Sequence, residues 1–453
     1  MTTKTFVPRR ATLWMGLFCA LGILFSCGSD DSEVEPDPDK DPDTETPVGS
    51  FDVLLTAKIP DNLYQLGGDG HGIIFASDEQ SGVLAAKEFH KGDDIGLKPD
   101  QVFAGKTITL TVVYVFKNPD KTNDYAFEAY TYTDVPRGVQ WNEWGQVLPP
   151  AQATAAGAIN ATVTKSSGWS GNVLHLATDY TFRSTDFSNS NTWHQEVTFG
   201  TSESLIAWED ASNDFRFAVY ENLTPGQVLE INTDDLTQVM AKETVPVPSN
   251  TRSLTVRLWG IPDRNENTVN YYVGGTSQYE DNDYNVKFPD IDLFETFDAA
   301  TELYTDDYDL HTSHHDAKYD ITPIDHQFSW TASQVGNITF SAAANAMDMI
   351  KLQWSYGEHG PNPYGYGEWF VFTAPGKDRV ATLPTLPALV TNLIGNTGIR
   401  EQFARNTVTF GAYDGVEGYA GWIALSTGTG SGMMNAYRLK KDWKEMVLSL
   451  KPN

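Results

Sequence analysis

The sequence has almost no cysteine and is short of basic residues. Only Cys19 and Cys27 occur in 453 residues, and both lie near the N-terminus. The rest of the chain can therefore use neither disulfide bonds nor thiol chemistry, and hydrophobic burial must stabilise it. Lysine and arginine number 31 against 60 acidic residues, for a net charge of −29. Because nucleic acids are bound through clustered basic side chains, we expect no nucleic-acid partner.

Common catalytic motifs are also missing. The chain has no Gly-x-Ser-x-Gly elbow, no His-Glu-x-x-His helix and no Walker loop, so we assign no catalytic residue. A carboxylate pair for glycoside hydrolysis stays open as an alternative, because the distance between two acids depends on tertiary structure. The candidates are Glu143, which lies between Trp141 and Trp144, and Glu368, which lies beside Trp369.

The N-terminus has the pattern of a secretion signal. Basic residues at positions 4, 9 and 10 precede an apolar stretch at 11–26, which is shorter than the roughly 20 residues that span a bilayer. Its end, Leu24-Phe25-Ser26-Cys27, resembles the lipobox of bacterial lipoproteins. The resemblance implies a signal peptide at 1–26, cleavage before Cys27 and acylation of that cysteine. Several acyl chains on one residue anchor a protein durably, so we expect an outer-membrane lipoprotein.

The residues after Cys27 resemble a localisation signal. Ser29, Asp30 and Asp31 resemble the Ser-acidic-acidic export signal of Bacteroidota lipoproteins, which implies display on the cell surface. One alternative is retention on the periplasmic side of the outer membrane. Another is that these acidic residues are only a solvated tether and carry no localisation signal. Repeated acids and four prolines make 27–50 an extended tether in either case.

The rest of the chain is typical of a mainly β protein. Runs rich in β-branched and aromatic residues alternate with Gly, Asn, Asp and Pro, which predicts strands and turns. The strands are expected within 51–59, 72–76, 107–116, 125–133, 172–182, 214–220, 253–259 and 326–333. This spacing favours tandem β-sandwich domains at 51–150 and 151–290, followed by a C-terminal β-rich domain at 291–453.

The two sandwich segments have a similar pattern of residues. At an offset of 132, Ile73, Ile74 and Asp78 match Leu205, Ile206 and Asp210, and at an offset of 134, Phe89, Gly92, Ile95 and Leu97 match Leu223, Gly226, Leu229 and Ile231. Related domains and generic β patterning explain these matches equally well. The pattern loosely resembles the prealbumin-like modules of Bacteroidota surface proteins, which serve as spacers and binding modules.

Two helices are expected near the C-terminus. The Pro-broken apolar segment at 383–394 is long enough for a short helix. An i, i+4, i+7, i+8, i+11 spacing predicts a terminal helix with one apolar face, made by Leu439, Trp443, Met446, Val447 and Leu450.

A loop rich in Gly, Pro and aromatic residues at 354–372 is a candidate binding site. Exposed tyrosine rings could stack on a sugar or another ligand, and the candidates are Tyr356, Tyr364 and Tyr366. Trp369 and Phe372 are expected to be buried instead.

Metal binding has two kinds of candidate. His311, His314 and His315 have a spacing that suits zinc if they converge, whereas in a strand His311 and His315 would share one face and His314 would point away. Hard oxygen ligands suited to calcium occur in the acidic loops 67–71, 280–283 and 414–417, which also fit ordinary hairpin turns.

Together these features favour a non-enzymatic, surface-anchored binding, adhesion or structural lipoprotein. Its expected partners are the membrane, through the lipid, and an extracellular polysaccharide or protein. The alternative is an outer-membrane-associated hydrolase, such as a glycosidase, with its site in the C-terminal domain.

Overall fold

The structure is a computed structural model. It describes residues 52–61, 63, 66, 70–118, 125–142, 155–169, 173–187, 190–200, 204–210, 215–262, 271–279, 284–334, 337–343, 347–357, 365–427 and 441–450. These residues form a mainly β protein with several sheets and two α-helices, which confirms the predicted fold class.

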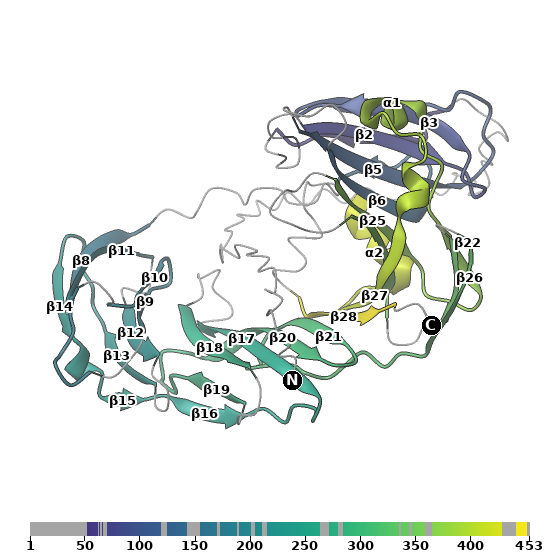
Figure 1. The fold of residues 1–453 in the computed structure, drawn as a ribbon. Helices are drawn as coiled ribbons and strands as arrows, with labels where there is room; N and C mark the ends of the chain where they lie inside the picture. Colours follow the sequence, from purple (N-terminus) through teal and green to yellow (C-terminus); the bar gives the residue numbers. More distant parts are fainter. Residues whose placement is uncertain are drawn as a thin grey trace, which may run out of the picture.

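One large sheet runs through most of the molecule (Figure 1). Its twelve strands, in the order in which neighbours are hydrogen-bonded, are β18 (Tyr271–Tyr279), β17 (Thr251–Ile261), β20 (Thr296–Thr305), β21 (Asp309–His314), β28 (Trp443–Ser449), β27 (Ala404–Tyr413), β24 (Met349–Tyr356), β25 (Tyr366–Thr373), β6 (Tyr125–Pro136), β5 (Thr107–Lys117), β2 (Gly70–Ser77) and β3 (Val83–Phe89). Figure 1 shows it curving from β2 and β3, in purple, to β17 and β18, in green.

Smaller sheets cover parts of this large sheet or pack on each other. One contains β4 (Asp94–Leu97), β1 (Leu55–Lys58) and β7 (Gln140–Trp141), and another contains β22 (Phe328–Gln334), β23 (Asn337–Ala342) and β26 (Arg379–Thr382). A two-stranded sheet contains β16 (Ala241–Thr244) and β19 (Asn285–Phe288).

The second sandwich consists of two further sheets. One contains β11 (Thr192–Phe199), β8 (Gly157–Thr164) and β14 (Val228–Asn232), and the other contains β10 (Phe182–Thr185), β9 (Val173–Ala177), β12 (Leu205–Asp210), β13 (Arg216–Tyr220) and β15 (Gln238–Val239). Apolar residues from both sheets meet in a second-sandwich core that includes Ile159, Leu174, Val197, Leu205 and Ile231.

The first sandwich is formed by the β4-β1-β7 sheet and the end of the large sheet that contains β2, β3 and β5, and their apolar side chains form the first-sandwich core. Along β2, Ile74 and Ala76 belong to this core. Ile73 and Phe75 point the other way, into the large-sheet core, which extends to Leu254 near the far end of the sheet. Because both faces of β2 are covered, four successive residues from Ile73 to Ala76 are apolar, rather than every second one.

Hydrogen bonding crosses both predicted domain boundaries. β17 pairs with β20 across residue 290, and β25 pairs in parallel with β6, from the first segment. The three predicted segments therefore share one sheet, and the division into domains remains a prediction.

The sequence similarity between the two sandwich segments corresponds only in part to similar structure. Gly92 and Gly226 both adopt positive φ angles, of 78° and 80°, just before the short strands β4 and β14. Afterwards the chain diverges, because β5 pairs with β2 whereas β17 pairs with β18 and β20 in the large sheet rather than with β12.

The predicted terminal helix is wrong. Residues 443–449 form β28, which is hydrogen-bonded between β21 and β27, with Met446 completely buried opposite Leu310 and Phe410. The helical spacing of apolar residues is overridden here, because two neighbouring strands offer the backbone a complete set of hydrogen bonds.

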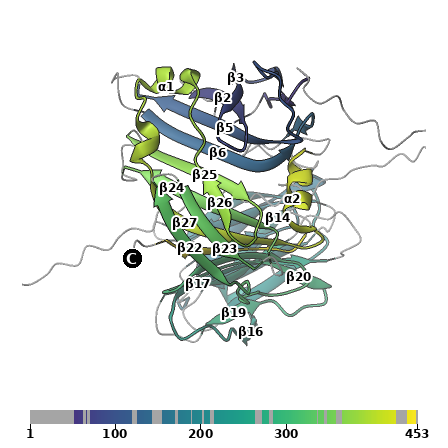
Figure 2. The ribbon, with the colours of Figure 1, turned by 90° about the vertical axis from the view of Figure 1, so that its right-hand side faces the viewer.

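Two short helices pack against the sheets, as Figure 2 shows. α1 (Ala388–Ile394) confirms the helix expected within 383–394 and contacts β3 and β5. α2 (Gly418–Thr427) contacts β7 and β24 through the first-sandwich core. No helix in the described ranges is long and apolar enough to cross a membrane.

Candidate ligand-binding pocket

A cavity of about 610 Å³ opens beside the parallel pair of strands β6 and β25. This volume lies within the roughly 300–1,000 Å³ range of small-molecule sites. Eight described residues line the cavity: Tyr125, Tyr356, Gly357, Gly365, Ile394, Gly395, Asn396 and Gln402. They come from the start of β6, the end of β24, the turn before β25, and the segment from α1 to the 3₁₀ helix Ile399–Gln402.

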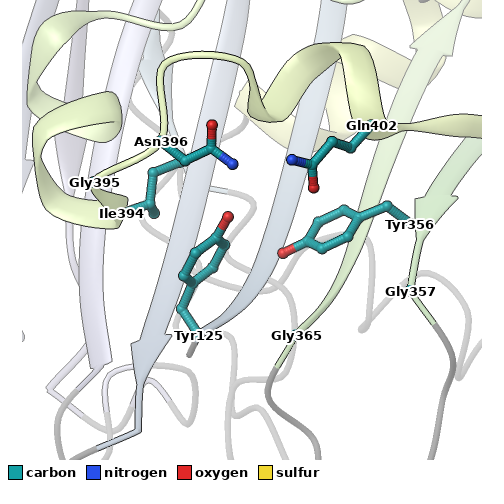
Figure 3. Close-up of a pocket in the computed structure, with 8 residues that line it drawn as sticks. All are labelled: Tyr125, Tyr356, Gly357, Gly365, Ile394, Gly395, Asn396 and Gln402. Atoms are coloured by element: carbon teal, nitrogen blue, oxygen red, sulfur yellow. The ribbon is translucent and has the colours of Figure 1, made fainter. Parts of the chain in front are cut away.

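Glycines let the backbone segments approach each other at this cavity. The backbone N–H of Gly365 donates a hydrogen bond to the carbonyl of Tyr125, 2.7 Å away. Gly357 has a φ of 73°, and a Cβ atom there would collide with the Gly365 carbonyl oxygen. Gly395 ends α1 in the left-handed conformation, which turns the chain so that Asn396 faces the cavity (Figure 3).

Two tyrosines and two amides supply the polar groups of the cavity. Figure 3 shows the Tyr125 and Tyr356 side chains on one side, with the Asn396 and Gln402 amides opposite them. Tyr125 is only 8% exposed and the Tyr356 hydroxyl is buried, whereas Asn396 is half-buried and Gln402 is exposed. The tyrosines thus form the inner wall and the amides form the rim.

Neighbouring contacts hold the Tyr356 and Asn396 side chains in place. The Tyr356 ring packs edge-to-face with Phe403, with ring centroids 4.9 Å apart. The Asn396 Oδ1 atom accepts a hydrogen bond from the Gly398 N–H at 2.9 Å, which orients the amide and leaves its two N–H donors for other partners. None of the eight lining residues is acidic, basic or a histidine.

The aromatic loop is only partly as predicted. Tyr356 lines the cavity, Tyr364 lies outside the described residues, and Tyr366 lies on β25, where its neighbour is Glu368 rather than the cavity. Trp369 is completely buried, as predicted, and donates from Nε1 to the Thr131 hydroxyl at 2.9 Å. Phe372 is half-buried and stacks on Tyr132 at 4.8 Å.

Three lining side chains were missed at the sequence level. Tyr125 is more than 200 residues away from Tyr356 in the chain. Their strands, β6 and β24, are neighbours of β25 on opposite sides, which brings the two tyrosines to one cavity. Asn396 and Gln402 follow α1, and the glycine at position 395 was the one local sign that the chain turns there.

A second cluster of polar groups includes Glu368, one of the two candidate acids. Glu368 is directly opposite Glu128 on the neighbouring parallel strand. Burial, and then the repulsion of the Glu368 carboxylate, raise the pKa of Glu128 above its usual range. The Tyr130 hydroxyl donates to Glu128 at 3.3 Å, and the Gln353 amide donates to Glu368 at 2.7 Å. The other candidate acid, Glu143, lies outside the described residues.

The three candidate metal-binding histidines do not converge. His314 and His315 both contact the carboxylate of Asp442, at 3.1 and 2.9 Å. His311 is directly opposite Glu302 and Glu445 on the neighbouring strands, and strand geometry points it to the other face from His314. Within the described residues, no group of three or more potential metal ligands is arranged to hold an ion.

The candidate calcium loops and the lipid site are largely outside the described residues. This applies to Cys27, Ser29, Asp30, Asp31, loop 280–283 and most of loop 67–71. The remaining loop, 414–417, forms a turn between β27 and α2, in which the Val416 N–H donates to the Tyr413 carbonyl at 3.1 Å.

Comparisons with known proteins identify no family. No family model matches the chain, and no curated protein matches it. Among solved structures, one similar chain is described as a "tetra-tandem repeat in extending region of large adhesion protein". It is 10% identical in sequence, and the match covers 79% of this chain and 94% of that one with a TM-score of 0.11. A TM-score this low supports no conclusion about fold or function.

Proposed function

We propose that this protein is a lipid-anchored, surface-displayed binding protein that holds an extracellular ligand in the cavity between Tyr125 and Gln402. The observation that carries the proposal is a cavity of about 610 Å³ with four uncharged polar side chains around it. Concave sites with a few placed polar groups are the usual form of small-ligand sites.

The chemistry of the lining favours binding over catalysis. Proton transfer at neutral pH is usually performed by carboxylates or imidazoles. The eight lining residues include neither group. The cavity therefore offers hydrogen bonds without an evident general acid or base.

Binding can be tested with the full chain purified in mild detergent. We expect retention on one class of immobilised extracellular polymer among neutral polysaccharides, acidic polysaccharides and mucin-type proteins. Asn396→Trp, which fills the cavity, should abolish retention, and soluble products should not appear. Failure to retain the unaltered protein on any of these polymers would remove the support for a binding function.

Anchoring belongs to the same proposal and is tested separately. Cys27→Ala should abolish incorporation of labelled fatty acid and leave an uncleaved precursor or a released protein. Continued acylation of that variant would contradict the lipid site.

Surface display is tested with protease on intact cells. Digestion should remove the folded part of the unaltered protein, and replacing Asp30 and Asp31 with alanine should protect it. Protection of the unaltered protein, with complete digestion after cell disruption, would place it in the periplasm.

A hydrolase is the second candidate, and the Glu128–Glu368 pair favours it. The two residues are register partners on adjacent strands, close enough for the Glu368 carboxylate to raise the pKa of Glu128, and retaining glycosidases likewise use two neighbouring carboxyl groups. A raised pKa suits Glu128 to the role of general acid and leaves Glu368 as the nucleophile.

The hydrolase candidate predicts release of reducing ends from a panel of polysaccharides. Glu128→Gln and Glu368→Gln should each abolish that release. Glu445→Gln, which removes a carboxylate paired with Lys351 on the same sheet, is the matched control and should leave the release intact. If the unaltered chain releases nothing, this candidate is rejected.

A further inference from the structure

We propose that the cavity recognises the hydroxyl groups of an uncharged sugar ring through hydrogen bonds, with its amide rim rather than stacked tyrosine rings providing the specificity. This inference rests on the proposed binding function and names the chemical class of its ligand. It differs from the expectation of a stacking surface, because the structure turns the two tyrosines into an inner wall.

The tyrosine rings have little free surface for stacking. Tyr125 is 8% exposed, and its backbone carbonyl at the start of β6 accepts a hydrogen bond from the Gly365 N–H. The Tyr356 ring is in edge-to-face contact with Phe403, which itself packs on Trp369 and Phe127. A sugar entering the cavity would therefore find little free ring surface on either tyrosine, and its hydroxyl groups would contact the amides at the rim.

The amides at the rim match the hydrogen-bonding capacity of hydroxyl groups. A hydroxyl both donates and accepts, and so does a carboxamide. Because the Asn396 Oδ1 atom is already bonded to the Gly398 N–H, Asn396 presents a fixed pair of donors to a ligand oxygen. Gln402, across the cavity, offers both a donor and an acceptor. With Asn396 fixed and Gln402 opposite it, the rim can distinguish one hydroxyl configuration from another.

The charge of the site excludes charged sugars. The lining has no basic residue to pair with a carboxylate or sulfate and no acidic residue to pair with an amine. An ionic group brought into the cavity would lose hydration without gaining a partner of opposite charge. The net charge of −29 adds a repulsion that further disfavours anionic glycans.

The test is calorimetric titration of the full chain in mild detergent. The probes are glucose, galactose, mannose and N-acetylglucosamine, their disaccharides and deoxy analogues, with glucuronate and glucosamine as charged counterparts. We expect at least one neutral sugar to bind, its epimers and deoxy analogues to bind at least ten-fold more weakly, and the charged sugars to show no binding.

Variants locate the binding in this cavity. Asn396→Ala and Gln402→Ala should each weaken the sugar that binds by about ten-fold or more, and the melting temperature should not change for Gln402→Ala, because that side chain is exposed. Gln238→Ala, an exposed glutamine on β15 of the second sandwich, is the matched control and should leave affinity unchanged.

Three outcomes would overturn the inference. A charged sugar that binds as tightly as its neutral counterpart contradicts the ligand class, and sugar affinity that survives both amide variants contradicts the site. If the protein is retained on a polymer but binds none of the neutral sugars, the binding function stands and the neutral sugar is rejected as its ligand. Absence of retention on every polymer rejects the proposed function itself, so the two failures are distinguishable.

Discussion

Strands β2 and β12 have similar sequences but contribute to different parts of the fold. At matched positions, Ile73 lies in the large-sheet core whereas Leu205 lies in the second-sandwich core. The next residues are reversed, because Ile74 lies in the first-sandwich core and Ile206 in the large-sheet core. The match at an offset of 132 is therefore out of phase by one residue, and a shift of one residue reverses the faces of a strand.

The later part of the similarity is in phase. Phe89 and Leu97 point into the first-sandwich core, and Leu223 and Ile231 point into the second-sandwich core. Strands with both faces buried need apolar residues at every position, so β2 and β12 resemble each other in any register. The sequence of a strand with both faces buried therefore predicts its register poorly, whereas the sequence of a strand with one buried face predicts it much better.

The largest expected effect comes from Trp208, which has no aromatic counterpart at the matched position of β2. It is 4% exposed and stacks on His175 and Phe215, with centroids 3.8 and 5.9 Å away. Trp208→Ala should lower the free energy of unfolding by about 3–5 kcal/mol, measured by denaturant titration. Trp193→Ala, at a half-buried position on β11, should cost less, and an equal loss would contradict the importance of this stack.

A direct test of the reversed faces compares Ile73→Ala with Leu205→Ala. Each removes a buried aliphatic side chain and should cost about 2–5 kcal/mol. Hydrogen exchange should show that Leu205→Ala loosens β8, β9 and β12, whereas Ile73→Ala loosens β5 and β6. If both variants loosened the same strands, the assignment of the two residues to separate cores would be wrong.

Acid should weaken the second sandwich in particular, because His175 of β9 stacks there on the buried Trp208 of β12. Burial lowers the pKa of His175 to about 4, below the value of about 6.5 in an unfolded chain. The unfolded state binds the proton first, so stability falls as the pH drops from about 6.5 to about 4, by at most ~3 kcal/mol. His175→Phe should remove this part of the pH dependence of the melting temperature. If the dependence of melting temperature on pH is unchanged, His175 is not its cause.

The smallest effects are expected at Gly92 and Gly226, where the two sandwich segments have the same positive-φ conformation. Alanine at either position must adopt a left-handed conformation, which costs about 1–2 kcal/mol. Gly92→Ala should cost more than Gly226→Ala, because its Cβ would lie 2.5 Å from Asp61 Oδ1 whereas nothing lies within 4 Å at Gly226. Gly226→Asn should recover part of the loss, and thermal melts that rank the three variants otherwise would contradict the shared turn.

Prediction from sequence worked where the determinants are local. β-branched residues between turn residues located most of the strands, and Pro and Gly framed α1. Prediction failed for β28. Its apolar residues have a helical spacing, but its backbone bonds to β27 and β21, at least 30 and 130 residues away in the chain. For the pocket, Tyr356 was predicted, whereas Tyr125, Asn396 and Gln402 were not.

The sequence alone determined the β class and the reliance on hydrophobic burial without disulfides, and it matched Gly92 with Gly226, which both adopt positive φ angles. These follow from composition and from the φ and ψ angles that each residue type allows. Only the tertiary structure decided which face of β2 or β12 meets which core, which acid stands opposite Glu368, and which side chains surround the pocket. The reason is physical: strand pairing depends on backbone hydrogen bonds that any residue except proline can make, so partners distant in the chain are selected by the packing of the whole sheet.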